Sequence, residues 1–157
     1  MTCLERIEQY LKQQGVRYEV LHHARAFTAQ RIAQAEHIPG KMQVKVVMLR
    51  SGDQFYMAVL PAVAQVDVGA FNKATGKKCQ LATEVEFKDL FPDCEIGAMP
   101  PLGSFYMLPV YADDMLEEDD EIVMQAGTHT ESVKITWDDY LRLERPTLVQ
   151  ISHRAYA

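Results

Sequence analysis

Two apolar runs joined by a short polar turn place the strongest limit on how this chain can fold. Residues 44–49 and 54–60 are rich in β-branched, aromatic and other apolar side chains, and Ser51-Gly52-Asp53 lies between them. A glycine in so short a connection favours a β-hairpin, because it accepts the backbone conformations of a tight reversal. The sequence therefore predicts an antiparallel hairpin at the centre of a sheet.

Helices are predicted on both sides of this hairpin from their start and stop signals. Thr-x-x-Glu capping boxes begin two of them, at Thr2 and Thr83. Thr28 and Asp67 can cap two more, and a fifth helix starts after Thr136. The predicted helices cover residues 3–14, 29–36, 68–73, 84–91 and 137–145.

Shorter apolar or alternating runs predict further strands. They cover residues 16–21, 79–82, 110–112, 121–125, 132–136 and 147–151. Strands and helices interleave too irregularly for a doubly wound parallel sheet. We therefore expect an α+β fold with a mixed, mostly antiparallel, barrel-like sheet of about six strands flanked by helices. The chain has no linker-like stretch and no repeat, so residues 1–157 are expected to form a single domain.

The charge balance limits the partners of the chain. Its formal net charge is −6, which argues against DNA binding or any mode that neutralises many phosphates over a basic face. Contact with one end of an RNA stays compatible with this charge. The N-terminal segment lacks the basic and apolar regions of an export signal, and no run approaches the roughly 18 apolar residues of a membrane span. We expect a cytoplasmic protein with no membrane partner.

Sequence signatures of metal and cofactor chemistry are missing. The five histidines never stand at the i, i+4 spacing of two ligands on one helical face, and the three cysteines form no Cys-x-x-Cys pair. No Gly-x-Ser-x-Gly elbow, phosphate-binding loop or dinucleotide fingerprint occurs. The sequence predicts no metal and no cofactor, and it favours free core thiols for Cys3, Cys79 and Cys94.

Lys45 is the least expected residue of the predicted hairpin. Strand alternation places its ammonium on the same face as Val47 and Leu49. Such a lysine either extends its head to water near the strand end or lines a cleft that binds an anion. The strand pattern leaves both interpretations open.

The loop Gly97-Ala-Met-Pro-Pro-Leu-Gly103 is the second candidate feature. Its prolines fix the backbone, whereas its glycines let a backbone amide approach a ligand closely. The loop can therefore shape a pocket wall without acid or base side chains, or it can serve as a structural turn.

Taken in order, these segments resemble a known family. The matching pieces are residues 23–28, 44–48, 62–68, 97–103, 108–113 and 126–127. Together they resemble the YbaK and prolyl-tRNA-synthetase-associated domain family of aminoacyl-tRNA deacylases, and they cover most of the chain. The resemblance implies a catalytic role for Lys45. The positions that it implies for substrate binding are Thr28, Gly97, Pro100, Pro101, Gly103, Gly127 and His129. For His129 a second interpretation stays open, in which it is a turn residue that faces solvent.

The resemblance also implies a mechanism and partners. An aminoacyl ester is already activated, so hydrolysis needs a positioned water, stabilisation of the oxyanion and a pocket that holds the wrong amino acid. The resemblance implies that the terminal 2′-hydroxyl of the RNA helps the reaction. The expected partner is the acceptor end of an aminoacyl-tRNA, and the first candidate is tRNA(Pro) that carries alanine, cysteine or serine. An aminoacyl-tRNA synthetase is a further candidate partner. Two alternatives are a binding module without turnover and a small-molecule hydrolase that uses Cys79 or Cys94 with a histidine.

Overall fold

The computed structural model describes residues 1–25 and 42–154. Helix α1, Cys3–Gln13, begins at the predicted capping box: the Glu5 amide donates to Thr2 Oγ1 (3.1 Å) and the Thr2 amide to Glu5 Oε1 (2.9 Å). It ends before Gly15, whose φ of +69° suits glycine. The helix prediction made from Thr28 lies outside the described residues.

The other helices are short. They are α3 (Val68–Thr75), α4 (Glu84–Phe87) and α5 (Trp137–Glu144), with 3₁₀ turns at Lys88–Leu90, Gly103–Tyr106 and Asp114–Glu118. The caps predicted at Asp67 and Thr83 are confirmed, and Thr136 also caps α5. The helix predicted up to residue 91 is wrong beyond Phe87, because it continues only as a 3₁₀ turn. Pro92 disfavours the helical conformation of Phe91, whose φ and ψ are −122° and 67°.

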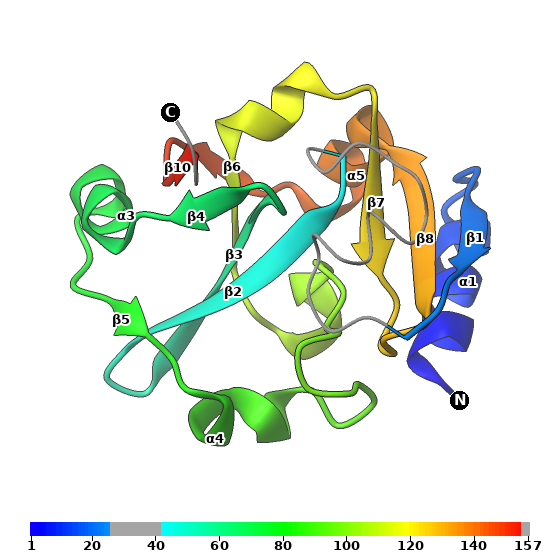
Figure 1. The fold of residues 1–157 in the computed structure, drawn as a ribbon, viewed down its shortest axis with the longest axis horizontal. Coiled ribbons are helices and arrows are strands. Elements are labelled where there is room, and N and C mark those ends of the chain that lie inside the picture. Colours follow the sequence, from blue (N-terminus) through cyan, green and yellow to red (C-terminus); the bar gives the residue numbers. More distant parts are fainter. Residues whose placement is uncertain (26–41, 155–157) are drawn as a thin grey trace.

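Ten strands form three sheets within the described residues (Figure 1). The five-stranded sheet has the order β5-β2-β3-β6-β9, the three-stranded sheet β1-β8-β7 and the two-stranded sheet β10-β4. Their bounds are β1 Glu19–His22, β2 Val44–Ser51, β3 Gln54–Pro61, β4 Ala64–Val66, β5 Gln80–Leu81, β6 Val110–Asp113, β7 Glu121–Gln125, β8 Glu131–Thr136, β9 Thr147–Val149 and β10 Ser152–Arg154.

The predicted hairpin and fold class are confirmed. Strands β2 and β3 pair antiparallel from Val44 opposite Pro61 to Ser51 opposite Gln54. The sheets are mixed and mostly antiparallel, but β6 runs parallel to β3, and β9 runs parallel to β6. The barrel-like closure is wrong for the described residues: the five-stranded sheet ends at the short edge strands β5 and β9. A barrel would need those edges to pair.

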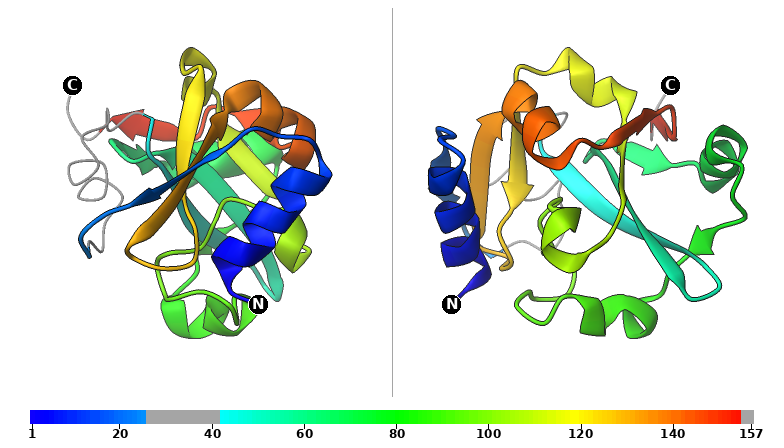
Figure 2. Two further views of the ribbon diagram at one scale, coloured as in Figure 1. Left: turned by 90° about the vertical axis from the view of Figure 1, so that its right-hand side faces the viewer. Right: turned by 180° about the vertical axis from the view of Figure 1, so that it is seen from behind.

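Side-chain alternation in β2 separates two hydrophobic clusters. Val44 and Met48 point into the main core, which they share with Ile7 and Leu11 of α1. Leu49 points to the opposite face, where it packs with Phe71 of α3. Figure 2 shows α1 along the three-stranded sheet, with α3 at the far end of the molecule. No helix of the described residues is long and apolar enough to cross a membrane.

Candidate functional site

Lys45 lies near the start of β2, directly opposite Leu60 of β3. It is half-buried, and burial lowers the pKa of its ammonium group below the ordinary lysine value. No carboxylate in the described part of the chain forms an ion pair with it. A desolvated cation with no carboxylate beside it is well suited to receive an anion or a polarised carbonyl.

The start of β2 also contacts β7. Gln43 and Val123 form an isolated parallel bridge, and the Val123 amide donates to the Met42 carbonyl at 2.9 Å. Beyond this bridge the two strands diverge (Figures 1 and 2). Two residues paired across a β-bridge point to the same side of the sheet. Because side chains alternate along a strand, the residues two positions further along the two strands point to that same side. Lys45 and Gln125 therefore lie on one face, on either side of the divergence.

Gln125 was missed by the sequence interpretation. Its side chain is 5% exposed, and among the described residues its Oε1 has no hydrogen-bond partner. It stands opposite Ser132 in the β7–β8 ladder, and Ser132 Oγ is 3.5 Å from His23 Nε2. The sequence feature that could have indicated it is a single amide side chain, Gln125, at the end of the otherwise apolar run 122–125. A buried acceptor without a partner is costly, so these polar groups are candidates for substrate recognition.

The turns around Gly97 and Gly127 are joined to each other. The Gly127 amide donates to the Ala98 carbonyl (2.9 Å), and the Glu95 amide donates to the Gly127 carbonyl (2.8 Å). Both glycines have positive φ, +85° and +93°. His129 Nε2 is 2.9 Å from the Ile96 carbonyl oxygen. The two turns therefore form one unit at the end of β7.

His129 is buried within this unit. It is 4% exposed, and its Nε2 also lies 3.7 Å from Glu95 Oε2. A Cβ added to Gly97 would stand 3.6 Å from the imidazole Cε1. The alternative of a solvent-facing turn residue is therefore wrong, because the histidine packs directly against the glycine loop.

The remaining loop residues have clear packing roles. Pro100 and Pro101 are buried, and the Tyr140 hydroxyl of α5 donates to the Pro101 carbonyl at 2.6 Å. A Cβ at Gly103 would collide with Val110 Cγ2 and would lie 2.5 Å from the Leu108 carbonyl oxygen. Contact of these three residues with a substrate stays a prediction. Thr28 lies outside the described residues.

The cysteine-hydrolase alternative has little support from the surroundings of the Cys79 and Cys94 thiols, which disfavour their ionisation. The Cys94 thiol is hydrogen-bonded to Cys3 and partly buried, and both effects raise its pKa far above the ordinary range of a cysteine. Burial also raises the pKa of Cys79. Neither thiol is poised to be a thiolate, which is the nucleophilic form.

Comparison with solved structures defines the class of fold. The chain superposes on a candidate trans-editing enzyme for prolyl tRNA synthetase with a TM-score of 0.84 and 22% identity, covering 98% of both chains. A scaffold protein used for computational epitope grafting matches with the same TM-score at 21% identity, again over 98% of both chains. The protein thus has the fold of small α+β editing proteins.

Sequence comparison gives the family. The profile of the aminoacyl-tRNA editing domain matches residues 23–143, so this chain belongs to that family. The multifunctional Ser/Thr-tRNA deacylase ProXp-y of Escherichia coli K12 is 27% identical over 157 residues, covering 96% of this chain and 93% of the relative. The expected family resemblance is confirmed.

Proposed function

We propose that this protein hydrolyses the ester bond of misacylated tRNA, with Lys45 at the centre of the site. The observation that carries the proposal is the half-buried ammonium, which forms no ion pair with a described carboxylate. In a chain with a net charge of −6, such a local cation can orient a single phosphate or carbonyl without broad RNA binding.

The mechanism needs little acid or base chemistry from the protein. Lys45 binds the terminal phosphate or the ester carbonyl, and the terminal 2′-hydroxyl of the RNA assists the attacking water. Among the described residues, the amides of Glu95 and Ala98 bond to backbone carbonyls, whereas that of Gly97 has no backbone acceptor. The Gly97 amide is therefore the candidate donor to the developing oxyanion, a contact that stabilises the transition state more than the ground state.

The substrate amino acid is proposed to be small and hydroxylated. The Escherichia coli relative is a Ser/Thr-tRNA deacylase by name, and serine was among the residues expected on tRNA(Pro). Gln125, which shares a face with Lys45, offers a buried amide to a substrate hydroxyl. A site that hydrogen-bonds a hydroxyl can reject an analogue lacking it by about 10⁴-fold.

The test is hydrolysis of tRNA(Pro) charged with serine, threonine, alanine or cysteine, with correctly charged tRNA(Pro) as control. Lys45→Ala should lower kcat/KM by about 100-fold or more, because removing one hydrogen-bond donor to an oxyanion typically lowers the rate by that factor. Lys12→Ala, which removes an exposed lysine of α1, is the matched control and should retain full activity.

Full activity in Lys45→Ala would refute the role of the lysine. No turnover on any charged tRNA, with saturable binding of an aminoacyl-adenosine mimic, would select the binding module instead.

We further propose that residues 1–157 act as one editing domain in the cytoplasm, and that a synthetase is a candidate partner.

A further inference from the structure

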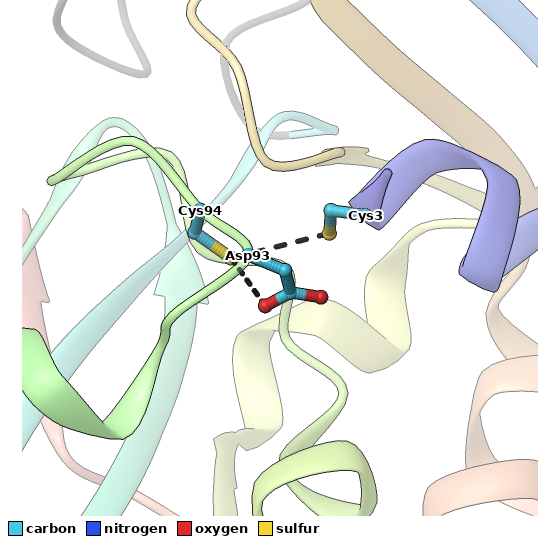
Figure 3. A group of neighbouring side chains, drawn as sticks. All are labelled: Cys3, Asp93 and Cys94. Carbon is cyan, nitrogen blue, oxygen red and sulfur yellow. Dashed lines mark hydrogen bonds between the residues drawn. The ribbon is translucent and has the colours of Figure 1, made fainter. Parts of the chain in front are cut away.

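Two cysteines that are far apart in the sequence meet beside the candidate site. Cys3 is the first residue of α1, and Asp93 and Cys94 follow the 3₁₀ turn Lys88–Leu90 (Figure 3). The sulfur atoms of Cys3 and Cys94 are 3.9 Å apart, and Cys94 Sγ is 3.5 Å from Asp93 Oδ1. One ligand atom from each of the three residues lies within 4.8 Å of the other two.

The sulfur–sulfur distance and the distance from Cys94 Sγ to Asp93 Oδ1 match two edges of a tetrahedral zinc site. Zinc bonds thiolate sulfur at about 2.3 Å and carboxylate oxygen at about 2.0 Å, which at the tetrahedral angle sets sulfur–sulfur and sulfur–oxygen edges of about 3.8 Å and 3.5 Å. A disulfide would need the two sulfurs to close to about 2.05 Å. The distances therefore fit a shared cation without movement of the two sulfurs.

We propose that Cys3, Cys94 and Asp93 bind one zinc ion. The two thiols release their protons to solvent as two zinc–sulfur bonds form, and the Asp93 carboxylate supplies the third bond. A water molecule fills the fourth position. Two thiolates and one carboxylate around Zn²⁺ give the complex a net charge of −1. Thiolate ligands favour zinc over the harder cations magnesium and calcium.

The surrounding groups already orient the ligands. The Tyr106 hydroxyl donates to Asp93 Oδ1 at 2.9 Å and lies 3.2 Å from Cys94 Sγ. Arg6 Nη1 is 3.6 Å from Asp93 Oδ2. Such partners fix the rotamers of metal ligands, and their loss elsewhere weakens metal binding by about 10- to 100-fold.

A cavity gives the ion a route of entry. All three ligand residues line a space of about 390 Å³, together with Glu95 and Glu131. Glu95 is already paired with Arg25 at 2.7 Å, so Glu131 is the carboxylate that makes this entrance attractive to a cation. The cavity also has room for the water at the fourth position.

The proposed ion would join α1 to the turn that holds the candidate editing site. Gly127 packs so closely on Cys3 that an added Cβ would stand 2.8 Å from the Cys3 sulfur. The same glycine is hydrogen-bonded to Glu95 and Ala98, on either side of Gly97. Zinc at Cys3 would therefore stiffen the turns that position Gly97 and His129. This structural role is separate from the proposed hydrolysis.

The test measures metal binding directly, on the reduced full-length protein. Zinc is titrated in competition with a chromogenic chelator, and cobalt is used as a spectroscopic probe of ligand type and geometry. The variants are Cys3→Ser, Cys94→Ser and Asp93→Asn, and the matched control is Cys79→Ser, because Cys79 is buried in the other hydrophobic cluster. Circular dichroism of the metal-free variants checks that each one folds.

Wild type and Cys79→Ser should bind one zinc ion each, and their cobalt complexes should show thiolate charge-transfer and intense tetrahedral bands. Loss of either thiolate ligand should weaken zinc binding by more than the roughly 100-fold that an outer partner of a ligand can contribute, and Asp93→Asn by at least about 10-fold. Equal affinity in Cys3→Ser, Cys94→Ser and wild type would overturn the proposal. So would an octahedral cobalt spectrum, or the lack of zinc binding by the reduced wild type.

Discussion

Replacing Gly127 by alanine isolates the close contact between α1 and the candidate site. Gly127 has a φ of +93°, and an added Cβ would collide with Cys3 Cβ and lie 2.8 Å from its sulfur. A side chain at such a φ costs about 1–2 kcal/mol, and overpacking a filled core costs about 1–3 kcal/mol more. Gly127→Ala should therefore destabilise the protein by about 2–5 kcal/mol, which for this size lowers Tm by roughly 5–15 °C.

Gly52→Ala is the matched control for the backbone part of this cost. Gly52 also has positive φ, +60°, but an added Cβ would meet nothing within 4 Å. Urea unfolding of both variants should give a loss of about 1 kcal/mol for Gly52→Ala and a clearly larger one for Gly127→Ala. Cys3→Gly removes the colliding atoms, so the double variant Cys3→Gly/Gly127→Ala should lose less stability than the sum of the two single losses. Equal losses in the two alanine variants, or strict additivity with Cys3→Gly, would refute the steric argument.

Two other substitutions test the roles of buried groups. Because burial lowers the pKa of Lys45 in the folded state, its cation opposes folding below that pKa, and stability should rise with pH from there towards the unfolded value near 10.4. Lys45→Met should remove this alkaline rise while leaving stability at neutral pH at least equal to wild type. Urea unfolding across this pH range measures both, and a less stable variant would contradict the assignment. Tyr140→Phe leaves the buried Pro101 carbonyl without its 2.6 Å partner and should cost about 1–3 kcal/mol in thermal unfolding. An unchanged Tm would show that this bond does not anchor the loop.

Local signals in the sequence predicted the local structure well. Both capping boxes form as expected, because their partners lie three residues apart. The hairpin follows from two runs and one glycine turn. The final strand begins at Thr147 as predicted but ends at Val149, and the separate strand β10 was missed. Its pairing with β4 was not visible in the sequence because the two strands are far apart along the chain.

The candidate site was only partly predictable for the same reason. Alternation placed Lys45 correctly on the face of Val47 and Leu49, but burial and the missing ion pair required the fold. The contact of His129 with Gly97 joins distant turns. Cys3 and Cys94 were expected to be unrelated core thiols, and only the packing of α1 on the turn after Pro92 brings their sulfurs to 3.9 Å.

The parallel ladder of β3, β6 and β9 has a consequence for how the polypeptide reaches its folded state. The Ile151 amide donates to Asp113 at the end of β6, and the Ile151 carbonyl accepts from the Asp67 amide at the start of α3. Contacts between residues so far apart in the sequence close slowly. During synthesis on a ribosome, β6 must therefore wait for β9 with an open edge, and until then it is exposed to pairing with other nascent chains.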